Sequence, residues 1–305
     1  DGDAPGPARA RLGALGSAAT FAPLVADISH WFTRRRGIAV AICISGNYVA
    51  GAVWPPVMEH YFAIVGWRQT YVGMGLFCIV AMLPLALLLR GRAPRIEAAA
   101  EGGAAASWSE RPLGFTPGQL QGLLCVAGVA CCVAMSMPQV HIVAYCGDLG
   151  YGVARGAEML SMMLGFGIIS RLASGWISDR IGGLRTLLLG SGLQAIALAL
   201  FLPFDGLVSL YVLSAMFGLF QGGIVPSYAI IVREYFSPLE AGQRMGTVLM
   251  ATLFGMALGG WMSGEIFDLT GSYHAAFLNG IGWNLLNLAI VFELLRRSRR
   301  YFALA

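Results

Sequence analysis

Residues 115–146, FTPGQLQGLLCVAGVACCVAMSMPQVHIVAYC, decide the fold, because they form a long, predominantly apolar run without an Asp, Glu, Lys or Arg. A helix needs about 20 predominantly apolar residues to cross the hydrocarbon core of a bilayer. The run lacks the period-2 alternation typical of a half-buried strand, and its length is that of a helix. It therefore predicts a membrane-spanning α-helix.

The same pattern recurs along the chain, which has 305 residues, 57% of them hydrophobic and 12% charged. Soluble domains carry about 25% charged residues, and a single soluble core of this size could not bury so much apolar surface. The composition therefore predicts an all-α integral membrane protein in contact with the lipid bilayer. The predicted spans are residues 12–30, 37–64, 69–90, 115–146, 154–178, 184–203, 207–235, 243–267 and 273–296.

The placement of arginine predicts the orientation. All 20 basic residues are arginine; with nine alternating spans, 15 lie in connections on one side, 4 lie on the other, and Arg171 falls inside a span. Because cytoplasmic loops carry the excess of basic residues, we expect a cytoplasmic C-terminus. The expected location is a bacterial inner (plasma) membrane. The arginines form no basic patch interleaved with polar or aromatic surface, so nucleic acid is not an expected partner.

Residues 91–114, rich in Ala, Gly and charge, are predicted to be a cytoplasmic linker. The linker would divide the chain into a partial bundle of three helices over residues 1–90 and a six-helix bundle over residues 115–305. Three predicted spans before the linker and six after it suggest a two-half protein that lacks three opening helices.

Motifs of enzymes are not found. The sequence has no His-rich metal cluster, no Gly-x-Ser-x-Gly nucleophile elbow and no phosphate-binding Gly-Lys-Ser/Thr loop. Its six cysteines lie in or beside apolar runs without paired metal-ligand spacing, which favours buried free thiols. We therefore expect neither an enzyme nor a metal or cofactor site.

Two predicted cytoplasmic connections combine charge with glycine. The first is HWFTRRRGIA at residues 30–39, which runs into SGNYVAG at residues 45–51, and the second is SRLASGWISDRIGGLR at residues 170–185. Asp179 and Arg180 at a helix end, before a turn at Gly182, can cap helices and pair charges across a seam between bundles. This favours a conformational latch; the alternative is an arginine cluster that only anchors the cytoplasmic side.

The second stretch resembles the loop between helices 8 and 9 of major facilitator transporters, where Gly-x-x-x-Asp-Arg-x-Gly recurs. The first resembles the start of helix 5 in the monocarboxylate and oxalate:formate branch. The residues that match the two patterns are Gly175, Asp179, Arg180 and Gly182, and Phe32, Arg35, Arg36, Ala39, Gly46 and Gly51. The resemblance implies helices 4 to 12 of a twelve-helix major facilitator bundle, with alternating access between its halves. The predicted latch comprises Gly175, Asp179, Arg180, Gly182, Arg34, Arg35 and Arg36.

Arg171 is the main candidate for substrate binding. It precedes Asp179 by eight residues, which places it about 12 Å along the helix from the cytoplasmic end. A charge there is costly unless a partner, a wet cavity or an anionic ligand offsets it. The resemblance implies an anion-binding arginine, often with an acid one turn earlier, but here that position is Gly167. The alternative is an arginine that snorkels or hydrogen-bonds neighbouring carbonyls.

The other predicted substrate-binding residues are Gln139, His141, Tyr145, Asn47 and Tyr228. Pro138 is expected to kink its helix, and His141 and Tyr145, four residues apart, share one helix face. His141 is also a candidate proton-linked group, because an unperturbed imidazole changes its charge near neutral pH. For each residue the alternative is a hydrogen bond between helices. Gly255-x-x-x-Gly259-Gly260 predicts helix packing only.

These expectations combine into a secondary active transporter of a small organic anion, a monocarboxylate or dicarboxylate, coupled to a proton or a counter-anion. Two alternatives stay open. One is a facilitator for another solute class, such as a sugar or a drug. The other is a truncated membrane protein that transports nothing.

Overall fold

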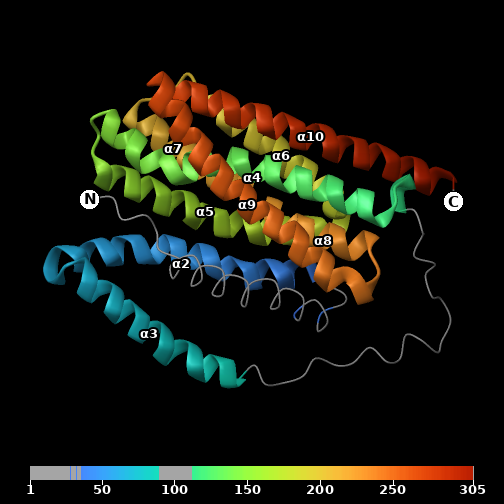
Figure 1. Ribbon diagram of the computed structural model, residues 1–305, viewed down its shortest axis with the longest axis horizontal. Coiled ribbons are helices and arrows are strands. Elements are labelled where there is room, and N and C mark those ends of the chain that lie inside the picture. The colour runs from blue at the N-terminus through green and yellow to red at the C-terminus, as the bar shows by residue number, and fades with distance from the viewer. Residues whose placement is uncertain (1–27, 29–31, 33–35, 89–111, 305) are drawn as a thin grey trace.

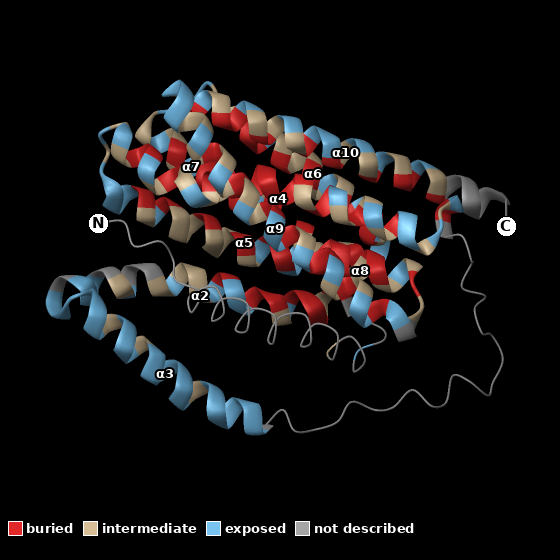
Figure 2. Ribbon diagram, viewed as in Figure 1, coloured by how far each residue is buried: buried red, intermediate tan, exposed pale blue. Residues whose placement is uncertain are grey.

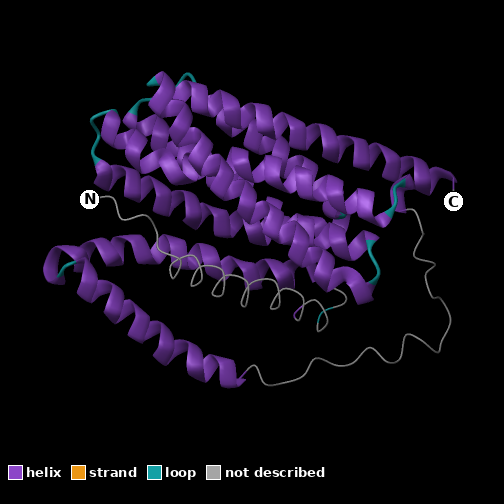
Figure 3. Ribbon diagram, viewed as in Figure 1, coloured by secondary structure: helices purple, strands orange, loops and turns teal. Residues whose placement is uncertain are grey.

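The computed structural model describes residues 28, 32, 36–88 and 112–304, and within them every regular element is a helix (Figures 1 and 3). The helices are α2 (Arg36–Val65), α3 (Trp67–Leu88), α4 (Pro117–Asp148), α5 (Val153–Ile181), α6 (Gly183–Leu200), α7 (Leu207–Gln221), α8 (Ile224–Tyr235), α9 (Pro238–Thr270) and α10 (Tyr273–Leu304), with a short 3-10 turn, η1 (Pro112–Gly114), before α4.

Eight stretches of the described residues are helical, long and apolar enough to cross a membrane. They overlap eight of the predicted spans; the span at 12–30, except for residue 28, and the linker, except for residues 112–114, lie outside the described residues. α9 begins at Pro238, before the predicted start at residue 243, because proline is well suited to the first turn of a helix. α10 continues past residue 296, where Glu293 pairs with Arg297 one turn later.

The predicted span at residues 207–235 is divided into α7 and α8 at Gly222 and Gly223. The physical reason is Pro226, which has no amide hydrogen to donate to the carbonyl four residues earlier, that of Gly222. Pro138, by contrast, lies within α4, which remains helical from Pro117 to Asp148.

The helices from α4 to α10 form one bundle around α4 (Figure 1). α4 packs against α5, α9 and α10, and Figure 2 shows how much of it is buried. Its fully buried side chains include Leu120, Leu124 and Ile142. An apolar core of this kind agrees with a bundle of membrane-spanning helices.

Small residues allow α4 and α9 to approach closely. A Cβ atom at Gly259 would lie 2.6 Å from the Cα of Val133, and one at Gly255 would lie 2.6 Å from the carbonyl oxygen of Val129. Glycine leaves room for this contact between backbones. The prediction that the Gly255–Gly259 motif serves helix packing is confirmed.

α2 lies along α5, whereas α3 turns away from the bundle (Figure 1). α2 buries Val40, Ile44 and Tyr48. None of the span Trp67–Leu87 in α3 is buried, as the pale blue ribbon in Figure 2 shows. The seam between α2 and α5 therefore joins the N-terminal helices to the six-span bundle.

We predict that Gly259→Ala lowers the thermal unfolding midpoint of the purified protein in detergent, because the added methyl group collides with the backbone of α4. Overpacking of this kind costs about 1–3 kcal/mol. The matched control is Gly246→Ala in the same helix, where a Cβ atom meets nothing within 4 Å. Alanine should leave the midpoint there unchanged or raise it. Equal midpoints for the two variants would contradict the close α4–α9 contact.

Candidate functional site

Arg171 lies in the middle of α5 and is 4% exposed. Its Nη1 donates a hydrogen bond to the carbonyl oxygen of Ile44 in α2 at 2.5 Å. Its Nε donates to the carbonyl oxygen of Gly222, between α7 and α8, at 3.2 Å. The centre of the guanidinium lies 3.5 Å from the ring centroid of Tyr48. The side chain of Arg171 thus connects α5 with α2 and with the break between α7 and α8.

The carbonyl of Gly222 is available to Arg171 because the helix itself cannot use it. In a regular helix this oxygen would accept from the amide of residue 226, which is proline and has none. Glycine at residue 222 also lets this backbone approach α5, since a Cβ atom would lie 3.1 Å from the Cα of Gly167. The break between α7 and α8 therefore supplies one of the acceptors of Arg171.

Among the described residues, none of the ion pairs includes Arg171. Its partners are two neutral carbonyls and a neutral ring. The carbonyl bonds agree in part with the alternative interpretation, but they come from other segments, and a 4% exposed side chain does not snorkel to the membrane surface. Arg171 is a buried positive charge that no described carboxylate neutralises.

A second polar link crosses the seam at the end of α5. Asp179 accepts a hydrogen bond from the amide of Gly37 at 2.8 Å and one from the amide of Ile38 at 3.3 Å. These are orphan N–H groups of the first turn of α2, where the helix dipole favours a negative charge. The backbones are close enough because a Cβ atom at Gly37 would lie 2.5 Å from the carbonyl oxygen of Gly175.

The remaining latch candidates are placed as follows. The guanidinium of Arg180 lies 3.7 Å from the ring centroid of Trp176. Gly182 adopts a φ of +85° in the turn between α5 and α6, a backbone conformation that favours glycine. Arg34 and Arg35 lie outside the described residues, and Arg36 is the first residue of α2. A carboxylate also caps α6, because Glu234 accepts from the amide of Gly183 at 2.9 Å.

Four of the predicted substrate-binding residues lie on α4 and α2. The Nε2 of His141 hydrogen-bonds to the carbonyl oxygen of Gly260 at 2.9 Å. The buried ring of Tyr145 packs against Tyr273, with 4.7 Å between ring centroids. Gln139 has a buried amide nitrogen without a hydrogen-bond partner among the described residues. Asn47 is exposed on α2.

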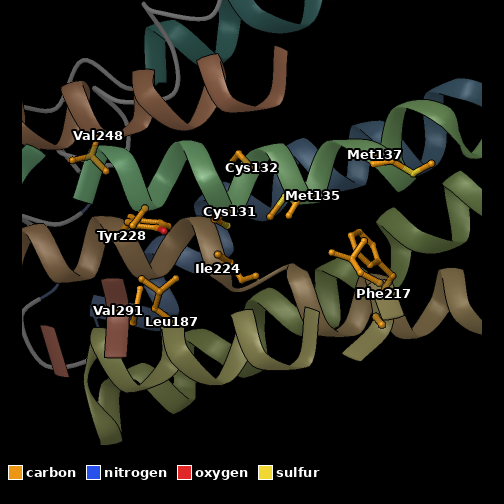
Figure 4. Packing of buried hydrophobic residues seen from close by; sticks show 14 of the residues in the cluster. Cys131, Cys132, Met135, Met137, Leu187, Phe217, Ile224, Tyr228, Val248 and Val291 are labelled. Carbon is orange, nitrogen blue, oxygen red and sulfur yellow. The ribbon is translucent and has the colours of Figure 1, made fainter. Parts of the chain in front are cut away.

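Tyr228 lies within the apolar core, beside Cys131 and other core side chains in Figure 4. Its hydroxyl donates to Oδ1 of Asn287 at 2.9 Å, and Nδ2 of Asn287 donates to Oγ of Ser191 at 2.7 Å. This is the hydrogen bonding between helices that the alternative interpretation describes. In the described part of the chain, Arg171 forms no hydrogen bond with any of the other predicted binding residues.

The contact between Tyr48 and Arg171 was not predicted from the sequence, and neither were the two segments that supply the carbonyl acceptors. A Cβ atom at Gly167 would lie 2.7 Å from Cε2 of Tyr48, so the ring fills the space beside this glycine. Two features of the sequence could have indicated these contacts. Gly167 precedes Arg171 by one turn, and Pro226 follows Gly222 by four residues.

All six cysteines are free thiols, as predicted, but their predicted burial is wrong in part. Cys78 is exposed because it lies on α3, outside the bundle, and Cys43 and Cys125 are half-buried. The described residues contain no group of three or more His, Cys, Asp or Glu side chains that could hold a metal ion.

The sequence profile of the Major Facilitator Superfamily matches residues 8–210 and 160–302. The chain is 28% identical to monocarboxylate transporter 13 of Rattus norvegicus over 277 residues, which cover 88% of this chain and 61% of that protein. It is 26% identical to the MFS-type transporter opdF of Penicillium oxalicum, over 81% of this chain and 58% of that protein. The chain thus spans about three fifths of the length of these relatives.

A solved structure has a similar fold. The crystal structure of the E. coli fucose:proton symporter FucP matches with a TM-score of 0.62 and 13% identity, over 89% of this chain and 72% of that chain. At this level of identity the match supports the arrangement of the helices. It agrees with the predicted all-α bundle.

We predict that Asp179→Ala accelerates amide hydrogen exchange in the first turn of α2 by about 2- to 10-fold, because the amides of Gly37 and Ile38 lose their acceptor. The expected change corresponds to the lower part of the free-energy range for the loss of a helix cap, because the carboxylate of Asp179 is solvent-exposed. The measurement is exchange mass spectrometry on peptides that contain residues 36–40. Asp205→Ala, which removes an exposed acid between α6 and α7, is the control. Unchanged exchange in Asp179→Ala would show that this cap does not hold α2.

Proposed function

The chain belongs to the Major Facilitator Superfamily, and on that premise we propose that it is a secondary active transporter of a small organic anion. The proposed substrate is a monocarboxylate or dicarboxylate, and the proposed mechanism is alternating access. Membership of this superfamily agrees with the expectation that the protein is not an enzyme. The monocarboxylate transporters among its relatives support the proposed substrate class.

The environment of Arg171 is the observation that carries the proposal. A buried guanidinium inside a membrane bundle is costly unless its charge is offset. Here two carbonyls and one ring solvate the cation, and no described carboxylate neutralises it. Arginine presents five N–H donors in a planar fork that suits a carboxylate. An incoming organic anion would supply the missing negative charge.

We assign the latch to the same transport cycle. Asp179 holds the first turn of α2 in the present arrangement, and alternating access requires that such a contact form and break as the halves rock. Gly175 and Gly182 would shape the latch, with Arg180 and the cluster Arg34, Arg35 and Arg36 at the same membrane surface. The arginine distribution supports a cytoplasmic C-terminus.

The other predicted residues have unequal support as parts of the path. Asn47 is exposed, and the amide nitrogen of Gln139 has no hydrogen-bond partner among the described residues, so both are proposed to line the path. His141 and Tyr228 are hydrogen-bonded to other helices, and Tyr145 is packed among aromatic rings. These three could contact a substrate only in a conformation in which those contacts break. Coupling to a proton or a counter-anion is part of the proposal.

The test is uptake into proteoliposomes that contain the full-length protein. The radiolabelled probes are pyruvate, lactate, succinate and oxalate, with glucose as a neutral comparison. An imposed pH gradient and an internal load of unlabelled carboxylate separate proton coupling from exchange. We expect at least one carboxylate to enter faster than in protein-free vesicles.

In the same assay Arg171→Gln should lower kcat/KM for that carboxylate by about 10- to 100-fold, because a charged hydrogen-bond donor is lost. The matched control is Arg155→Gln, which removes an exposed arginine that pairs with Glu158 at 3.4 Å. Its kcat/KM should stay within about twofold of the unaltered protein. Undiminished uptake of every carboxylate by Arg171→Gln, or uptake of glucose alone, would refute the proposal.

A further inference from the structure

The aromatic face of Tyr48 covers the guanidinium of Arg171 from the other side of the α2–α5 seam. The distance from the Arg171 Cζ atom to the ring centroid is 3.5 Å, and Tyr48 is 7% exposed. A cation over a ring face is attracted by the negative potential of that face, and more strongly where water is excluded. Tyr48 is therefore a partner of the charge and not only a packing residue.

Gly167 fixes where the ring can lie. A Cβ atom at this position would lie 2.7 Å from Cε2 and 2.8 Å from Cδ2 of Tyr48. Any larger residue would push the ring from its place, because such short distances do not occur between real carbon atoms. Gly167 and Arg171 are one helical turn apart. The same face of α5 thus holds the edge of the ring and the cation beneath it.

The guanidinium is held in a defined orientation. Of its five N–H groups, two donate to the carbonyls of Ile44 and Gly222. The ring of Tyr48 covers one face. Within the described residues no hydrogen bond of Arg171 uses the other three N–H groups, which lie in the plane of the guanidinium. A planar carboxylate would reach Arg171 along its edge, the approach that gives paired N–H···O bonds.

We propose that Tyr48 is a positioning residue for the anion site: its ring pre-orients the Arg171 guanidinium so that a carboxylate meets the free N–H edge. This inference rests on the proposed function, because it concerns how the anion binds at Arg171. Pre-orientation lowers the cost of ordering a flexible side chain when the ligand arrives. Since Tyr48 is on α2 and Arg171 is on α5, the site is complete only while the seam is closed.

The effect of Tyr48 should appear in the affinity for carboxylates. In proteoliposomes with the full-length protein, Tyr48→Leu should raise KM for the transported carboxylate, with pyruvate and succinate as probes, by about 2- to 30-fold. kcat should change by less than about twofold, because the cation itself is retained. Tyr48→Phe keeps the ring face and should restore the original KM. Tyr61→Leu, which removes a half-exposed tyrosine from the same helix, is the control.

Two further variants show whether Tyr48 acts through Arg171. Gly167→Ala should raise KM in the same way with Tyr48 present, because the methyl group displaces the ring. If Tyr48→Leu does not fold, Gly167→Ala alone tests the positioning role. In the Arg171→Gln background, Tyr48→Leu should add less than about a twofold effect, since no cation is left to position. Non-additivity of this kind identifies two residues that act as one unit.

The outcomes separate the two proposals. If Arg171→Gln impairs carboxylate uptake but Tyr48→Leu and Gly167→Ala keep the original KM, the positioning role is wrong and the proposed function stands. A lowered KM in Tyr48→Leu, or equal effects of Tyr48→Leu with and without Arg171, would also overturn it. If Arg171→Gln leaves the uptake of every carboxylate unchanged, both proposals fall.

Discussion

The contact between the backbones of α2 and α5 at Gly37 and Gly175 is the constraint on which the polar links of the seam depend. Membrane helices gain little from hydrophobic association, because lipid is as apolar as their side chains, so close packing and hydrogen bonds hold them together. With both glycines present, the carboxylate of Asp179 reaches the amides of α2. Two turns deeper, the guanidinium of Arg171 reaches the carbonyl of Ile44.

Both charged links of this seam use the backbone of the facing helix and not an opposite charge. Asp179 is exposed at the helix end, so water and the dipole of α2 share its charge at modest cost. Arg171 has the same kind of partner at a buried position, where a lone charge is far more expensive. The two links have similar geometry, but the free-energy cost of an unneutralised charge is larger at Arg171 than at Asp179. The deeper one is where a ligand of opposite sign has most to contribute.

The eight spans in the described residues could be predicted from the sequence because apolar length is a local property, and the packing role of Gly255 and Gly259 follows from their spacing alone. The partners of Arg171 could not. Tyr48 lies 123 residues earlier, and only the register between α2 and α5 brings it to the cation. For His141 and Tyr228, the sequence could not show which side of the helix each residue faces. A helix that is apolar all round carries no pattern that shows which face meets a cavity, so their hydrogen bonds within the bundle appear only in the structure.

Pro226 leaves the carbonyl of Gly222 without an amide donor in its own helix, and Arg171 satisfies that oxygen instead. The bend in this span and the charge that would bind an anion are therefore thermodynamically linked. A ligand that draws the guanidinium away leaves the carbonyl in need of water or of a new donor. By reciprocity, any movement that rehydrates or re-pairs this oxygen changes the affinity of Arg171 for its ligand by the same factor. Because Pro226 lacks an amide hydrogen, ligand binding at Arg171 and the bend between α7 and α8 are coupled.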